Sequence, residues 1–455
     1  MPKDFSDIFS QRKCKMHLTF IKYFPLCPRT RQSLFSLDET LKGLCFSGRL
    51  LEAVDLLCRK GSSADPQTYA FLLQEAINRK EIRLGRRIHA QMITTGLVPH
   101  EYLRTKLVIF YAKNGFMETA HQIFDRISHG DLVSWNAMIS GCVQNGLEQE
   151  GLNLYYSMRS AGLEPDQFTF ASVFRACARL ALLEHGKRAH SVMIKTQMKA
   201  NVVVSSALVD MYFKCSSLSD GFMVFKGSSE RNVVTWTALI SGYGQHGRVV
   251  EVLELFHQMI EDGFRPNPVT FLAVLSACSH GGLVDEGWKY FSSMRRDYGI
   301  RPRGEHYAAI VDMLGRAGRL DEAYEFVRKS PCEEHSVIWG ALLGASRIHG
   351  NVELGKLAAK RIFKMQPENV GKYIVLSNTF AAYEMWEKVA GVRRMIRSLG
   401  IKKVPAWSSI EIQGEVHTFL VGDKSHEQSE MIYEMVNSLC CALAEAGYAS
   451  DTWRI

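Results

Sequence analysis

The stretch GYGQHG, from Gly242 to Gly247, has the spacing G-x-G-x-x-G. Between a strand and a helix, glycines at this spacing hold the pyrophosphate of a dinucleotide cofactor. The segment 101 residues earlier aligns without a gap and reads GCVQNG, in which Val143 replaces the middle glycine. Apolar residues at helical spacing flank both stretches, whereas the fingerprint needs a preceding strand. We therefore interpret Gly247 as the glycine of a helix–turn–helix connection, and the sequence predicts no cofactor.

The sequence contains none of three common catalytic motifs, namely H-E-x-x-H, the Walker lysine motif and G-x-S-x-G. The eleven cysteines never stand at Cys-x-x-Cys spacing. Cys142, Cys177 and Cys278 lie inside apolar helical patterns, which indicates reduced structural thiols. His417 and His426 lack paired ligands, and we interpret them as hydrogen-bonding residues. The sequence therefore predicts no catalytic residue and no metal ligand, and this chain is not expected to be an enzyme by itself.

Composition and charge indicate a globular chain with a basic leader. Of the 455 residues 46% are hydrophobic and 22% charged, and no run approaches the roughly 18 apolar residues of a membrane span. Residues 1–35 contain seven Lys or Arg and two Asp, which gives +5 of the formal net charge of +8. Lys22 interrupts the apolar run that a secretory signal needs, so residues 1–35 are expected to be an organelle transit peptide. The expected organelle is the mitochondrion, and the alternative is the chloroplast. The alternative is a basic leader without a targeting role.

The strongest feature of the sequence is self-similarity at an offset of 101 residues. GRRIHAQMI, which begins at Gly85, corresponds to GKRAHSVMI, which begins at Gly186, and Gly287 falls in the same register. Breaks that contain Gly or Asn divide each 101 residues into parts of 35, 31 and 35. Each part shows two apolar stretches at helical spacing. One helical hairpin cannot bury both apolar faces, so stacked hairpins and an all-α solenoid are predicted.

This 35, 31 and 35 pattern resembles the P, L and S motifs of the plant pentatricopeptide repeat family. The amino-acid sequences of the motifs are also similar to those of that family, as in SWNAMISG, TWTALISGYGQHGR, VLSACSHGGLVDEGWKYFSSM and EHYAAIVDMLGRAGRLDEA. The resemblance implies a right-handed α-solenoid superhelix of helix–turn–helix repeats over residues 36–335. After a degenerate motif at 36–65, the expected motifs are L 66–100, S 101–131, P 132–166, L 167–201, S 202–232, P 233–267, L 268–303 and S 304–335.

The C-terminal part resembles the E and E+ extension of the same family. Residues 336–405 read as two further helical hairpins of the E motif, and residues 406–455 match the E+ signature, with WSSIEIQGEVHTFLVGDKSH. Alternating residues around Gln413 and Gly414 predict a β-hairpin in this segment. The chain ends at GYASDTWRI, where longer relatives continue into the DYW deaminase domain, so that domain is expected to be missing.

The resemblance also implies how RNA is read, with one base per motif contacted by two polar residues. One is the fifth residue of a motif. The other is the last residue of the same motif, which we call the closing residue. The expected base-recognition pairs are Thr105/Asp131, Asn136/Asp166, Ser206/Asn232 and Thr237/Asn267. The family code assigns them G, U, A and A, while Ala70, Ala171, Leu272 and Ala308 at fifth positions specify no base. The alternative for each polar residue is a solvated position or a helix cap. Ser216 replaces the usual glycine, so the motif that contains the Ser206/Asn232 pair departs from the family pattern.

Proteins with an E+ extension resemble site-recognition factors for cytidine-to-uridine editing of organelle transcripts. Hydrolytic deamination needs zinc, Cys and His ligands and a glutamate, with H-x-E and C-x-x-C motifs. None of the fifteen histidines is followed by Glu at the second position. We therefore expect an adaptor that binds single-stranded organelle RNA and recruits a DYW-type cytidine deaminase and other editing factors through E/E+. The alternatives are a factor for RNA stability, splicing or translation, and a protein-binding helical scaffold.

Overall fold

The structure is a computed structural model, and it describes residues 36–61, 64–127, 130–228, 230–366, 370–398, 400, 407–412 and 415–446. The expected transit peptide at 1–35, the two residues of the expected hairpin turn at 413–414 and the terminal GYASDTWRI lie outside the described residues. The chain divides into two compact units, Met1–Gly130 and Asp131–Ile455.

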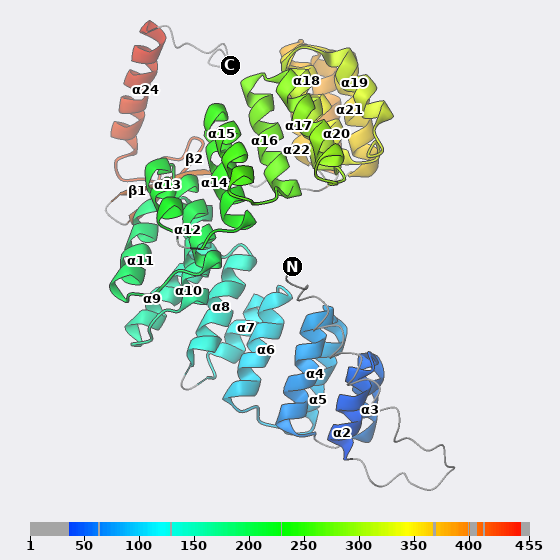
Figure 1. Ribbon diagram of the computed structural model, residues 1–455, viewed down its shortest axis with the longest axis vertical. Coiled ribbons are helices and arrows are strands. Elements are labelled where there is room, and N and C mark those ends of the chain that lie inside the picture. The colour runs from blue at the N-terminus through cyan, green and yellow to red at the C-terminus, as the bar shows by residue number, and fades with distance from the viewer. Residues whose placement is uncertain are drawn as a thin grey trace, which may run out of the picture. The chain divides into compact units, whose positions relative to one another are not determined.

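The described part of the first unit is built from paired antiparallel helices (Figure 1). We call the two members of each pair the first helix and the second helix. The pairs are α2 (Leu37–Phe46) with α3 (Leu50–Lys60), α4 (Pro66–Arg79) with α5 (Ile82–Thr94), and α6 (Glu101–Lys113) with α7 (Met117–Phe124).

The second unit continues the same arrangement. Its first helices are α8 (Leu132–Gln144), α10 (Gln167–Leu180), α12 (Val202–Lys214), α14 (Val233–Gln245), α16 (Pro268–Gly281), α18 (Gly304–Arg316), α20 (Ser336–Ile348) and α22 (Val370–Ala382). Their second helices are α9 (Glu148–Ser160), α11 (Leu183–Lys195), α13 (Leu218–Gly227), α15 (Val249–Glu261), α17 (Val284–Arg296), α19 (Leu320–Lys329), α21 (Val352–Met365) and α23 (Trp386–Ser398).

The helices form two layers within each unit. In the second unit each first helix packs against the next one, from α8 through α10, α12, α14, α16 and α18 to α20, and each second helix packs on its own first helix. Fully buried aromatic residues such as Phe170, Phe174, Trp236 and Trp339 fill the space between the layers. The expected all-α solenoid of stacked hairpins is therefore the observed fold, because each hairpin buries its apolar faces against its neighbours.

The first helices begin where polar residues can cap them. α8, α10, α12, α14 and α16 begin directly after residues whose side-chain oxygens accept from backbone N–H groups of the first turn, namely Asp131, Asp166, Asn201, Asn232 and Asn267. Asp and Asn are among the best residues for this position because the first N–H groups of a helix have no partner within it. These helices start at the residues that open the expected motifs.

The connection between a first and a second helix needs a left-handed backbone conformation. Gly115, Gly146 and Gly247 fill this position with φ of 82°, 80° and 69°. Ser216 occupies the corresponding position of its motif at φ 60° and is exposed. A side chain is strained in this region, so replacement of the usual glycine costs stability but leaves the turn in place.

The glycines that recur at an offset of 101 residues let helices approach closely. A Cβ atom on Gly186 would lie 2.5 Å from Sδ of Met211, and one on Gly287 would lie 2.3 Å from Sδ of Met313. In the first unit, a Cβ atom on Gly85 would lie 2.2 Å from the ring of Phe110. The second helix of each L motif therefore contacts the next first helix at a point without room for a side chain.

The C-terminal segment contains the only strands among the described residues. β1 (Trp407–Ile412) and β2 (Glu415–Leu420) pair antiparallel, with Ile412 opposite Glu415 and Trp407 opposite Leu420, so the predicted β-hairpin is confirmed. The last helix, α24 (Ser429–Glu445), carries no buried residue. Every helix in the described part of the chain is too short or too polar to span a lipid bilayer.

Candidate nucleic-acid interface

The G-x-G-x-x-G stretch lies at the end of α14, and each of its glycines has a different structural environment. A Cβ atom on Gly242 would lie 2.4 Å from the ring of Phe213, whereas one on Gly244 would meet only ordinary contacts at 3.7 Å and beyond. Gly247 forms the left-handed turn with φ 69°, and Nε2 of His246 lies 2.7 Å from the carbonyl oxygen of Phe213. A helix precedes the stretch instead of a strand, so these glycines serve helix packing and the turn.

Two buried cysteines and the histidine pair of the C-terminal segment have structural surroundings. Burial raises the pKa of the Cys142 thiol to about 12 and that of Cys278 to about 11, which disfavours the reactive thiolate form. Nε2 of His426 lies 3.0 Å from Nδ1 of His417, and Nδ1 of His426 accepts from the backbone N–H of Gln428. Among the described residues no third His, Cys, Asp or Glu completes a metal site at this histidine pair.

The closing residues combine a capping role with an unused polar atom. Oδ1 of Asn232 accepts from the N–H groups of Val234 and Thr235, and Oδ1 of Asn267 accepts from the N–H group of Thr270. These donors fix which amide atom is the oxygen, because an amide nitrogen cannot accept a hydrogen bond. Within the described part of the chain, Nδ2 of both asparagines lacks a partner, so each presents a hydrogen-bond donor.

The hydroxyl-bearing fifth residues share one geometry. Each Oγ donates to the carbonyl oxygen four residues earlier, over 3.0 Å for Thr105, 2.7 Å for Ser206 and 2.6 Å for Thr237. This bond uses the only proton of the hydroxyl group, so its oxygen lone pairs make it an acceptor toward any ligand. All three side chains are mostly buried in the first-helix layer.

Asn136 and Asp166 contact each other directly. Nδ2 of Asn136 donates to Oδ1 of Asp166 over 2.9 Å, and the same Oδ1 accepts from the N–H groups of Phe168 and Thr169. Oδ2 of Asp166 has no hydrogen-bond partner among the described residues. This pair therefore presents a carboxylate oxygen as an acceptor and the second proton of the Asn136 amide as a donor.

Two predicted pairs line a single groove. The groove has a volume of about 540 Å³ and contains Ser206, Asn232, Thr237 and Asn267 from α12 and the starts of α14 and α16. We call it the α12–α16 groove. Its size falls in the range of about 300–1,000 Å³ that is typical of small-molecule sites. The structure thus brings together two pairs that lie in successive motifs of the sequence.

Apolar side chains that sequence reasoning missed also line this groove. Val203, Val234 and Val269, the second residues of α12, α14 and α16, are 52%, 52% and 57% exposed. The second position is also apolar and exposed in other first helices, with Tyr102, Val133, Phe168 and Val337. By contrast Trp236, two residues after Val234, is fully buried against Phe225, with ring centroids 4.7 Å apart, so this tryptophan packs in the core. The sequence signal for these exposed side chains was the recurrence of valine at the second residue of the first helices.

One cation faces the groove without an acidic partner. Arg175 on α10 is exposed and has no carboxylate partner among the described residues. Asp210, which also lines the groove, pairs with Lys214 over 2.9 Å between Oδ2 and Nζ. The groove therefore keeps an unpaired positive charge at one end, which a phosphate group can approach.

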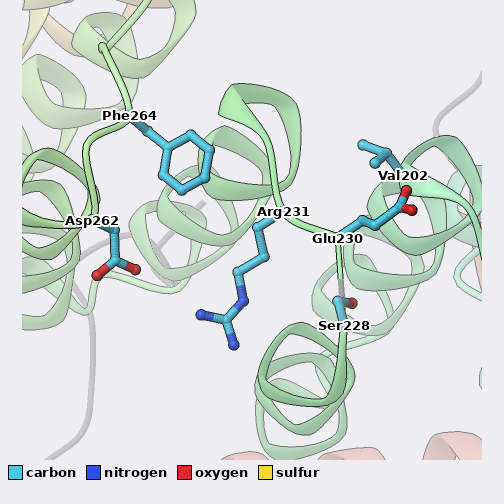
Figure 2. Close-up of a pocket in the computed structure, with 6 residues that line it drawn as sticks. All are labelled: Val202, Ser228, Glu230, Arg231, Asp262 and Phe264. Atoms are coloured by element: carbon cyan, nitrogen blue, oxygen red, sulfur yellow. The ribbon is translucent and has the colours of Figure 1, made fainter.

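A second cavity of about 680 Å³ lies among the connections that precede α14 and α16. Figure 2 shows the Arg231 side chain in it, with Asp262 and Phe264 on one side and Glu230 on the other. The Arg231 guanidinium lies 4.8 Å from the ring centre of Phe225. One cation and two carboxylates give this cavity a net negative lining, so it does not suit a phosphate group.

The remaining predicted site residues are not brought together into one site. Thr105 belongs to the first unit, whereas Asp131 caps α8 in the second. Ala70, Ala171 and Ala308, at fifth positions expected to specify no base, are buried alanines on first helices. Of the expected base-recognition residues, the structure therefore brings together the Asn136/Asp166 pair and the four residues of the α12–α16 groove.

Three family models match parts of the chain. The model of the PPR repeat family matches residues 130–179 and 231–280, that of the PPR repeat matches 269–298, and that of the E motif matches 349–411. The E-motif match begins inside the hairpin of α20 and α21, and it overlaps most of the segment expected at 336–405.

Curated relatives match most of the chain. A pentatricopeptide repeat-containing protein of Arabidopsis thaliana is 59% identical over 415 residues, which cover 91% of this chain and 83% of the relative. Two others from the same plant, named chloroplastic and mitochondrial, are 42% and 39% identical over 82% and 89% of this chain. The chain spans 46% and 63% of their lengths.

A solved structure shares the fold. It is that of the pentatricopeptide repeat protein PPR10 in complex with an 18-nt psaJ RNA element, with a TM-score of 0.56 and 15% identity. The similar region covers 78% of this chain and 59% of that chain.

Proposed function

Because the chain belongs to the pentatricopeptide repeat family, we propose that it binds single-stranded RNA and reads one base with each polar pair. The observation that carries this proposal is the α12–α16 groove, in which Ser206, Asn232, Thr237 and Asn267 occur together. PPR10, which shares the fold, is in complex with RNA in its solved structure. RNA modules with repeated helices read successive bases with side chains from successive repeats.

The chemistry of each pair follows from the atoms that capping leaves unused. Thr237 presents a lone pair and Asn267 presents the Nδ2 protons. The Thr237 lone pair can accept from the amino group of adenine, and the Asn267 Nδ2 can donate to N1 of adenine. Asp131 and Asp166 present carboxylate oxygens, which only accept and thus match N–H groups of guanine or uracil. With the pair assignments G, U, A and A, the chain would read G-U-n-A-A, where n is any base opposite Ala171.

The exposed apolar residues supply the contacts that do not depend on base identity. Val203, Val234 and Val269 flank the two asparagines along the groove. Apolar side chains on either side of a base contact its ring faces, which holds the base edge against the polar pair. Arg175 can neutralise a backbone phosphate at the same groove, so affinity should fall as salt is raised.

The C-terminal extension supports an adaptor role in organelle RNA editing. The E motif matches here, and α24 exposes Met431, Met435, Leu439 and Leu443 at four-residue intervals. An exposed apolar helix face of this kind suits a protein partner. The array would select the transcript, and the E/E+ region would recruit a DYW-type cytidine deaminase in trans. The organelle would be the mitochondrion or the chloroplast, the two compartments named for the relatives.

Sequencing of organelle cDNA from a plant line that lacks this protein tests the editing role. In the family's alignment, the last S motif lies on the fourth base upstream of the edited cytidine. The expected result is loss of editing at one or a few sites with G-U-n-A-A at the tenth through sixth upstream positions. Intact editing with altered transcript abundance or splicing would instead assign the RNA-binding chain to RNA processing.

A further inference from the structure

A threonine at the third residue of a following first helix joins the two members of a base-recognition pair. Thr169 is the third residue of α10, and its hydroxyl donates to Oδ1 of Asn136 over 2.6 Å and lies 3.0 Å from Oδ1 of Asp166. Thr270 is the third residue of α16, and its hydroxyl lies 2.8 Å from Oγ1 of Thr237 and 3.1 Å from Oδ1 of Asn267. Both threonines are fully buried, so neither can contact a base.

These contacts determine which atoms the pairs present. The Thr169 hydroxyl holds Oδ1 of Asn136, which leaves Nδ2 to donate to Asp166 and, with its second proton, to a ligand. The Thr270 hydroxyl contacts both Thr237 and Asn267, which have no direct hydrogen bond between them among the described contacts. A side chain held in one orientation before binding loses less entropy when it binds.

The link is not a necessary consequence of helix capping, because Thr235 lacks it. Thr235 is the third residue of α14, is fully buried, and accepts from the backbone N–H of Asn232 over 2.9 Å, just as Thr169 and Thr270 accept from Asp166 and Asn267. Its hydroxyl donates to the backbone oxygen of Asn232 over 2.9 Å and makes no described contact with the fifth residue Ser206. The chain therefore contains a natural comparison between capping alone and capping with a link.

We propose that Thr169 and Thr270 are positioning residues that set base specificity in the motif before their own. Each of these base choices is then encoded by three residues, and the third belongs to the next repeat. The inference rests on the proposed RNA-binding function and deepens it.

The test compares Thr270→Val, Thr270→Ser and Thr235→Val in the full chain. Valine keeps the shape of threonine without the hydroxyl, whereas serine keeps the hydroxyl. The measurement is the ratio of the Kd values for a G-U-n-A-A RNA with A or with G opposite the Thr237/Asn267 pair. Wild type is expected to prefer A by on the order of tenfold. Thr270→Val should reduce this ratio to less than about threefold, and Thr270→Ser should restore it.

Thr235→Val controls for the loss of a capping hydroxyl, because it should lower thermal stability as Thr270→Val does while leaving the ratio at the wild-type value. A wild-type ratio in Thr270→Val, or an equal fall in Thr235→Val, would overturn the positioning role while RNA recognition stands. Absence of any base preference in wild type would reject the proposed function itself, and the positioning role with it.

Discussion

Nδ2 of Asn136 lies 2.9 Å from Oδ1 of Asp166, so the fifth residue of one motif is hydrogen-bonded to the residue that caps the next first helix. The cap uses Oδ1 of the aspartate, and Oδ2 stays without a described partner. A helix cap and a base-recognition residue were alternatives for this position in the sequence. The two roles are compatible in one side chain, because base recognition would use the atom that capping leaves unused.

Asn267→Asp should change the base that the last polar pair prefers. Aspartate caps a helix as well as asparagine does, so α16 should remain intact. The substitution replaces the Nδ2 donor with a second acceptor, which matches the N1–H and N2 amino donors of guanine. We expect the preference opposite Thr237/Asn267 to move from A to G by about 1–3 kcal/mol. Competition binding with RNAs that differ only at this base measures the change, and an unchanged preference for A would exclude a role for this pair.

The apolar face of α24 is predicted to act in editing and not in RNA binding. Met435→Glu combined with Leu439→Glu adds charge to residues that are 64% and 56% exposed, so the fold should tolerate it. We expect RNA affinity to stay within about twofold of wild type, because the helix lies outside the base-recognition motifs. When this double variant is expressed in a plant line that lacks the protein, it should fail to restore editing. The matched control is Ser438→Glu, an exposed polar position on the same helix, which should restore editing.

Gly242→Ala and Gly244→Ala should have opposite effects on stability although they lie two residues apart on α14. A Cβ atom on Gly242 would lie 2.4 Å from the ring of Phe213, which is buried and cannot move away, so we expect a loss of about 1–2 kcal/mol. Gly244 has room for a methyl group, and alanine favours a helix by up to about 1 kcal/mol. The free energy of unfolding in urea, compared with that of wild type, measures both effects. Equal destabilisation would show that these glycines do not have the separate roles described.

Two partly buried histidines should make the chain less stable in mild acid. Nδ1 of His89 lies 2.7 Å from the Tyr111 hydroxyl, and Nδ1 of His190 lies 2.8 Å from that of Tyr212. Burial lowers the pKa of both histidines below the ordinary value of 6.5. The unfolded chain therefore takes up protons first, and stability present above about pH 6.5 is lost as the pH falls toward the lowered values.

The double variant His89→Asn with His190→Asn tests this pH dependence. Asparagine can still bond to the tyrosine hydroxyl but does not titrate. Thermal unfolding at about pH 7.5 and about pH 5.5 should show a smaller difference for the double variant than for wild type. His280→Asn, at an exposed histidine, should leave the wild-type difference unchanged. A double variant as acid-sensitive as wild type would contradict the assignment.

Much of the fold was predictable because it depends on local pattern. Apolar residues at helical spacing, the recurring Gly85, Gly186 and Gly287, and the alternation around β1 and β2 each report contacts that repeat along the chain. The assignment of Gly247 to a turn followed from the same self-similarity.

The details of the site were less predictable because they depend on contacts across repeats. The link from Thr270 to Thr237 joins residues 33 positions apart, and a threonine at the equivalent position, Thr235, makes no such link. Exposure of Val203, Val234 and Val269 could not be read from residue type, since valine is usually buried. The base-recognition roles of the eight polar residues remain predictions.

Equilibrium binding of the full chain to two single-stranded RNAs of equal composition tests most directly whether the polar pairs read RNA sequence. One contains G-U-n-A-A and the other contains the same bases in the order A-A-n-U-G. The first RNA is expected to bind at least about tenfold more tightly than the second, and its affinity is expected to fall as salt is raised. Equal affinity for the two RNAs would contradict the claim that the polar pairs read RNA sequence.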